Sequence, residues 1–237
     1  MRFLSALLND VRFQVKYGFY FLYAFFSAIY IALLLVCPQE YKKTAAAIII
    51  LSDPAMLGSF FIGGIWLLEK GEGLHRYWVI SPLRTLEYIL SKSVSLALIS
   101  TIAANLIVAA SLKHDVNYAM LTISTFVGSM VFTVIGLIVA TYAQSVNQYM
   151  ILVSPLEIII TTPPIWAALG IWHPALDIFP GMALWHIINY SIGKTSHIEA
   201  WLLPVLFYGF SLLSCWRTDA YLLPCKRKEV IRHESDN

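Results

Sequence analysis

Long stretches without any Asp, Glu, Lys or Arg constrain this chain more than any other feature of its sequence. A helix needs about 20 apolar residues, at ~1.5 Å rise per residue, to cross the ~30 Å hydrocarbon layer of a membrane. Only 13% of the residues are charged, about half the share found in soluble domains. The composition therefore excludes an ordinary soluble enzyme. The charge-free runs cover residues 17–39, 54–68, 93–112, 116–156, 158–176 and 200–216.

These runs predict an all-α fold, a polytopic membrane protein whose single membrane domain occupies residues 1–237. The run at 116–156 is about twice the length of one span, so it must turn, and the polar patch at 144–148 is the natural place. A β-barrel would show alternation in segments of about 10 residues, whereas these runs are continuous. Six transmembrane helices are expected, near residues 18–37, 46–68, 91–112, 117–142, 149–171 and 200–217.

The distribution of Lys and Arg predicts the orientation, because these residues concentrate in cytoplasmic loops. With the N-terminus inside, the cytoplasmic segments hold twelve of the 16 Lys and Arg residues. Both termini, including the basic tail at 218–237, are therefore expected in the cytoplasm. The formal net charge of +2 is too small to indicate nucleic-acid binding. The three cysteines are far apart and form no CxxC pair, so they indicate no metal site.

Residues 2–16 have the pattern of an amphipathic helix, which we expect within an N-terminal segment 1–17. Apolar residues recur at helical spacing on one face, and polar or basic residues lie opposite. Such a helix would lie along the inner leaflet with its basic residues toward lipid phosphates. A simple flank that sets the topology is the alternative. The apolar face holds Leu4, Leu7, Leu8, Val11 and Val15, and the opposite face holds Arg2, Asn9, Arg12 and Lys16.

The segment at 69–84, between the second and third expected spans, is the most informative part outside the membrane. It opens with a charged cluster at 69–72, and its two glycines permit a sharp turn. Ser81 and Pro82 are typical of the N-cap and first turn of a helix. We expect a short cytoplasmic helix joined rigidly to two spans, the shape needed to pass a push from a soluble partner into the membrane. A plain connector is the alternative.

This region resembles the loop of ATP-binding-cassette exporter membrane subunits of the ABC-2 type. In that family an acidic, Gly-containing cluster precedes a Ser/Thr-Pro-Leu step, followed by a Tyr and a Lys that enters the third span. The stretch at 53–63 looks like the subgroup of fluoroquinolone or multidrug export permeases. The resemblance is residue-specific over about 53–92 and covers the whole chain in architecture. The matching residues are Glu69-Lys70-Gly71-Glu72-Gly73, Ser81-Pro82-Leu83-Arg84, Glu87-Tyr88 and Lys92.

The resemblance implies an exporter subunit of a bacterial plasma membrane that moves a hydrophobic or amphipathic small molecule outward. Residues 2–16 would be the connecting helix, and the loop at 69–92 would be the coupling element that a nucleotide-binding subunit grips. A second permease copy, identical or paralogous, would complete the pathway within the lipid membrane. The residues implied in coupling are Glu69, Glu72, Arg76, Ser81, Pro82, Leu83 and Arg84.

The chain is not expected to be an enzyme or to hold the ATPase itself. A phosphate-binding loop needs the pattern G-x-x-x-x-G-K-[ST]. Gly193-Lys194-Thr195 supplies its last three letters, but Ile188 occupies the position of the first glycine, and the tripeptide falls outside the cell in this topology. We therefore expect no cofactor in this chain, with ATP and Mg bound by the partner subunit.

Two acids within the expected spans, Asp53 and Glu157, are candidate substrate-pathway residues, because an ionised group at mid-bilayer costs about 2.5–3.5 kcal/mol on insertion scales. Asp53 precedes Pro54, and its alternative role is to bond backbone groups freed by the proline. Glu157 lies between prolines, with Thr161 one turn further on, and together they would suit a cationic amphiphile. A hydrogen-bonded packing acid is the alternative for Glu157.

The expected external segment at 172–199 is aromatic and broken by prolines, and we expect it to dip into the outer leaflet or lie on it. Three histidines in it, His173, His186 and His197, are candidates for a metal site. Their spacings give no i, i+4 pair, which favours interfacial histidines over ligands.

Two other classes of function compete with the exporter hypothesis. An intramembrane hydrolase of the rhomboid type needs a G-x-S-G serine, and Gly209-Phe210-Ser211-Leu212 lacks the last glycine. A pore or assembly protein without energy coupling would explain the hydrophobicity, but it would leave the chemistry of residues 69–84 unexplained.

Overall fold

A computed structural model describes residues 2–74, 85–112, 116–171 and 173–194, and the regular structure in these ranges is helical. Within them, five helical segments are long and apolar enough to cross a membrane, which confirms the all-helical membrane fold. The sixth expected span at 200–217 and the tail at 218–237 lie outside the described residues. The five segments are Phe19–Val36, Gln39–Gly71, Glu87–Ser111, Tyr118–Tyr142 and Val146–Ala168.

The N-terminal amphipathic helix is present as α1 (Arg2–Lys16), and α2 (Phe19–Val36) follows it directly. Gly18 makes the turn between them with φ 77°, a left-handed conformation that glycine adopts without steric cost. Leu4, Leu8 and Val15 are exposed, which leaves the apolar face of α1 free to contact lipid. The edge of α1 that carries Asp10 and Gln14 turns to the bundle, whereas Asn9, Arg12 and Lys16 are exposed.

The second span is longer than predicted and is broken. It consists of α3 (Gln39–Ser52) and α4 (Leu57–Gly71), whereas one helix at 46–68 was expected. The first turn of α3 is polar, so it was not counted when spans were placed by their lack of charged residues. Helix α3 ends before Pro54, which has no N–H to continue the helical ladder. The Asp53 carbonyl accepts from the amides of Met56, at 3.2 Å, and Leu57, at 2.8 Å, and this turn restarts the chain as α4.

The third span begins earlier than expected, at Thr85 rather than near residue 91, because helix α6 (Thr85–Ser111) includes a first turn with the acid Glu87. The next two spans follow the prediction closely as α7 (Tyr118–Tyr142) and α8 (Val146–Ala168). The polar patch between them makes the expected turn. Ser145 caps α8 by accepting from the amide of Gln148 at 3.3 Å.

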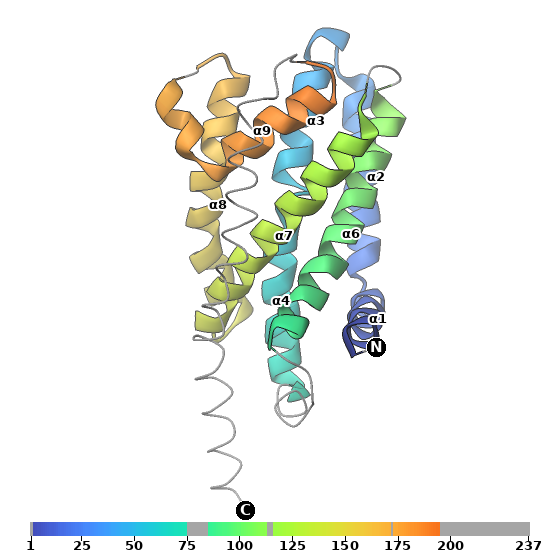
Figure 1. Ribbon diagram of the computed structural model, residues 1–237, viewed down its shortest axis with the longest axis vertical. Helices are drawn as coiled ribbons and strands as arrows, with labels where there is room; N and C mark the ends of the chain where they lie inside the picture. The colour runs from blue at the N-terminus through green and yellow to red at the C-terminus, as the bar shows by residue number, and fades with distance from the viewer. Residues whose placement is uncertain (1, 75–84, 113–115, 172, 195–237) are drawn as a thin grey trace, which may run out of the picture.

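The bundle is built around α7, which packs against α4 and α6 along its length and also contacts α8 (Figure 1). Helix α1 lies at the end of the bundle where α4 ends and α6 begins (Figure 1). The opposite end is closed by a 3-10 turn (Pro174–Ile178) and α9 (Pro180–Ser191). The expected external segment therefore includes a helix that packs on α3, α7 and α8, with Met182, Trp185 and Ile188 buried.

Small residues let the central helices approach closely, as is usual in membrane bundles. A Cβ on Gly136 of α7 would lie 2.7 Å from the Cα of Ser59 in α4. A Cβ on Gly58 would overlap the hydroxyl of Thr133, and one on Gly63 would overlap the ring of Tyr149. The backbone of α4 is thus in direct contact with both α7 and α8.

Gly63→Ala is expected to destabilise the protein relative to Gly64→Ala. Both changes add the same methyl to α4, but the nearest atom to a Cβ on Gly64 is 4.0 Å away, on Phe19. Overpacking costs about 1–3 kcal/mol, which lowers a melting temperature by about 2–4 °C per kcal/mol in a chain of this size. Thermal melts of the two detergent-solubilised variants check this, and equal melting temperatures would contradict the tight contact between α4 and α8.

Candidate functional site

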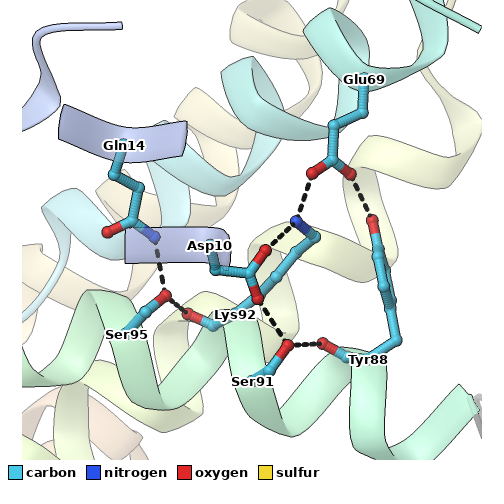
Figure 2. Close-up of polar contacts among 7 residues, drawn as sticks. All are labelled: Asp10, Gln14, Glu69, Tyr88, Ser91, Lys92 and Ser95. Atoms are coloured by element: carbon cyan, nitrogen blue, oxygen red, sulfur yellow. Dashed lines mark hydrogen bonds and ion pairs between the residues drawn. The ribbon is translucent and has the colours of Figure 1, made fainter. Parts of the chain in front are cut away.

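Three helices meet at one buried lysine. Lys92 lies in α6 with its side chain 1% exposed. Its Nζ is 2.8 Å from Oδ1 of Asp10, in α1, and 2.5 Å from Oε1 of Glu69, near the end of α4 (Figure 2). A buried charge is tolerated when it is paired and hydrogen-bonded. We call Asp10, Glu69 and Lys92, with their hydrogen-bonding neighbours, the junction cluster.

Hydroxyl donors satisfy the other oxygen of each carboxylate in the junction cluster. The Tyr88 hydroxyl donates to Oε2 of Glu69 at 2.7 Å, and the Ser91 hydroxyl donates to Oδ2 of Asp10 at 2.5 Å (Figure 2). The Tyr88 ring also lies 4.8 Å from the ammonium of Lys92, a cation–π contact. The arrangement is therefore fixed by the geometry of several bonds and not by Coulomb attraction alone.

A further bond extends the contact between α1 and α6. The Gln14 amide donates to the Ser95 hydroxyl at 2.7 Å, and that hydroxyl donates to the Lys92 carbonyl at 2.8 Å (Figure 2). Asp10 and Gln14 are one helical turn apart, so they present one polar edge of α1 to α6. The residues of α6 that bond to them also recur at helical spacing: Ser91, Lys92 and Ser95.

The junction cluster can act as a mechanical link. One lysine holds two acids that belong to different helices, so a displacement of the end of α4 must move α6 and α1 or break buried ion pairs. Breaking such a pair by removal of one partner costs about 3–5 kcal/mol. The link lies directly before residues 72–84, which the sequence analysis predicts to include the coupling element.

The predicted coupling residues fall in three classes. Glu69 is buried in the junction cluster. Glu72 is exposed at the end of α4, where its carboxylate accepts a hydrogen bond from the Tyr17 hydroxyl. This bond raises the pKa of the Tyr17 phenol and ties the beginning of the loop to the turn between α1 and α2. The others, Arg76, Ser81, Pro82, Leu83 and Arg84, lie outside the described residues.

Asp10, Gln14 and Lys92 are site residues that the sequence analysis missed. Lys92 entered it only as part of a resemblance, and Asp10 belonged to neither face assigned to α1. The sequence did contain a signal for them. Asp10 is an acid in an amphipathic helix and Lys92 lies beside a charge-free run, and both charges need partners. The partner could not be assigned without knowing which helices are neighbours.

The two intramembrane acids do not form a common site. Glu157 is 8% exposed, and its carboxylate is hydrogen-bonded to the Ser59 hydroxyl of α4. Asp53 is half-buried at the break between α3 and α4 and is hydrogen-bonded to Tyr30 of α2. The hydroxyl of Thr161 donates to the Glu157 carbonyl of its own helix at 2.7 Å. Its bond is therefore internal to α8.

Two histidines of the segment at 172–199, His173 and His186, have structural partners. Nε2 of His186 lies 3.3 Å from Oδ1 of Asp177, and burial lowers the pKa of this imidazole. Nδ1 of His173 accepts from the amide of Ala175 at 3.2 Å and caps the 3-10 turn. His197 lies outside the described residues. Across the described part of the chain, no group of three or more His, Cys, Asp or Glu side chains is placed to hold a metal.

Comparison with known proteins identifies one family. The model of the fluoroquinolones export permease protein family matches residues 1–220. Two proteins from strains of Mycobacterium tuberculosis, each named a fluoroquinolones export permease protein, are 29% identical over 183 residues, which cover 76% of this chain and 76% of each relative. No solved structure matches the chain.

Proposed function

The chain belongs to the fluoroquinolones export permease protein family, and from this premise we propose that it is the membrane subunit of an ATP-driven exporter. As a member of that family it is a multi-pass export permease, a transport subunit rather than an enzyme. The finer proposal is that a separate nucleotide-binding subunit holds ATP and Mg and supplies the energy. The plasma membrane is the proposed location, with both termini in the cytoplasm.

The junction cluster is the observation that best supports the proposal of ATP coupling. A permease that opens passively has no need to join its loop to two helices through a buried lysine. In the proposed exporter, closure of the nucleotide-binding subunits pushes on residues 72–84. The displacement passes from Glu69 to Lys92 and so reaches α6, while Asp10 makes α1 follow.

The proposed substrate is an amphipathic aromatic compound of the fluoroquinolone type. The names of the two mycobacterial relatives support this class. A second permease chain, identical or paralogous, would join this one, and the two chains together would line the pathway. Alternating access would follow from tilting the broken second span and α6 together.

The test is export in cells that lack their own drug pumps. With the partner nucleotide-binding subunit, the chain is expected to lower fluoroquinolone accumulation several-fold. The reduction should vanish when the phosphate-loop lysine of the partner is replaced, because hydrolysis then fails. Glu40→Gln, at an exposed acid of α3, is the matched control and should export normally. Equal export by the chain alone would overturn ATP coupling through a partner subunit.

A further inference from the structure

Glu157 occupies the middle of the membrane-spanning part of α8. It is the twelfth of the 23 residues of that helix, which places it about 16 Å from either end at ~1.5 Å per residue. Its side chain turns inward to α4, and the residue is 8% exposed. Among the described residues, no Lys, Arg or His forms an ion pair with it. Glu157 thus differs from both acids of the junction cluster, which share a lysine.

The Ser59 hydroxyl can serve Glu157 in either protonation state. Its Oγ lies within hydrogen-bond distance of the Glu157 carboxyl and 2.6 Å from the Met56 carbonyl. A hydroxyl has one proton to donate. If Ser59 donates to Met56, a neutral Glu157 donates to Ser59. If Glu157 is ionised, Ser59 donates to it, and the Met56 carbonyl keeps the Ser59 amide at 2.9 Å.

The surroundings of Ser59 hold unused hydrogen-bonding capacity. Ser59 lies in the first turn of α4, directly after the break in the second span, and many transporters bind substrates at such mid-membrane breaks. The Thr133 hydroxyl faces Gly58 in this turn, is fully buried and has no hydrogen-bond partner among the described residues. Ser129, one turn earlier in α7, bonds to Ser100 of α6 at 3.1 Å. A polar row therefore leads from Glu157 across the bundle.

The closure of α8 on α4 at this point depends on few contacts. Besides the bond from Ser59 to Glu157, the Tyr149 hydroxyl donates to the Ser59 carbonyl, and the Tyr149 ring lies against Gly63. The residues of α8 away from α4 are mostly exposed, among them Ile151, Ile158 and Ile159. A movement of α8 away from α4 would open the carboxyl to a ligand.

We propose that Glu157 binds the ammonium group of a cationic amphiphile at the break between α3 and α4, with Ser59 as its partner while the site is empty. The proposal rests on the proposed function and names the substrate class of that exporter. The buried carboxyl supplies the counter-charge for the ammonium, and no described Lys, Arg or His forms an ion pair with it. The Thr133 hydroxyl adds an acceptor and a donor for a polar group of the ligand.

Two probes with one ring system test this in the wild-type chain. The first is a quinolone with a free basic amine, and the second is its N-acetyl derivative, which carries no positive charge. Their binding is measured with the full chain in lipid nanodiscs. Wild type is expected to bind the amine about tenfold more tightly, the effect of one charge-assisted hydrogen bond. Equal binding of the two probes would overturn the proposal without any variant being needed.

The Glu157→Gln variant then tests whether the preference for the amine probe depends on Glu157. The amide has the shape of the carboxyl and can still bond to Ser59, so the fold should be retained, as a thermal melt will show. The variant is expected to bind the N-acetyl probe as wild type does and to lose the tenfold preference for the amine. Glu40→Gln should keep the preference. A preserved preference in Glu157→Gln would overturn the proposal.

The outcomes separate this inference from the proposed function. Export of both probes to the same extent by wild type with its partner would leave the exporter intact and overturn the role of Glu157. If wild type neither binds nor exports either probe, the proposed substrate fails and the inference fails with it.

Discussion

Lys92→Met is expected to cause the largest loss of stability of any single change at the junction cluster. The methionine fills the same volume but leaves Asp10 and Glu69 buried without a cation. The cost should be about 3–5 kcal/mol, which corresponds to a fall in melting temperature of about 10 °C for a chain of this length. Thermal unfolding in detergent measures it.

The control for that experiment is Lys70→Met, because Lys70 is an exposed lysine in the last turn of α4. It should change the melting temperature little. A triple variant that combines Lys92→Met with Asp10→Asn and Glu69→Gln removes the stranded charges and should recover part of the loss. If Lys92→Met melts with wild type, the three residues do not form a buried ion cluster.

Glu69→Gln is expected to lower export about tenfold while the protein stays folded. The amide can still accept from Tyr88, and Lys92 keeps Asp10 as its counter-ion. The variant therefore loses the ionic tie between α4 and α6 without stranding a charge. Drug accumulation in cells that carry the partner subunit gives the export rate, and abundance in the membrane gives the amount of folded chain. Glu40→Gln is the control, and normal export by Glu69→Gln at equal abundance would show that force does not pass through residue 69.

The spans were predictable from the sequence to the extent that charge marks the edge of the membrane. The ends of α2, α7 and α8 lie within a few residues of the expected bounds, because polar turns or prolines interrupt the apolar runs there. The rule began the third span near residue 91, whereas α6 begins at Thr85, because Glu87 and Lys92 interrupt the apolar pattern within the helix. Paired with two acids, this lysine is buried inside the helix.

Two features of the fold depend on long-range contacts and could not be predicted from the sequence: the restart of the second span and the burial of α9. Pro54 predicted a disturbance in the second span, but the restart of the helix at Leu57 depends on how α4 packs against α7. The sequence of α9 was interpreted as an interfacial segment because its aromatic residues are compatible with a membrane surface. They are equally compatible with a protein core. Its burial follows from the neighbours it meets, α3, α7 and α8.

The structure places Glu69 in a buried ion cluster whose other members the sequence did not indicate, and its role in coupling stays a prediction. An acid at the end of a span suggests a role, but its partner, Lys92, lies 23 residues further along the chain, and Asp10 comes from a helix outside the bundle core. For Glu157 the sequence indicates an acid inside a span, and the structure shows that the Ser59 hydroxyl is its hydrogen-bonding partner.

The account is tested most directly by measuring ATP hydrolysis and quinolone transport together in liposomes that contain the chain and its nucleotide-binding subunit. Wild type is predicted to transport substrate in proportion to the ATP consumed. Glu69→Gln is predicted to hydrolyse ATP at a similar rate but to move about tenfold less substrate per ATP. Transport that is independent of ATP, or an unchanged ratio in Glu69→Gln, would contradict the claim that the junction cluster carries the force from a separate ATPase into the membrane helices.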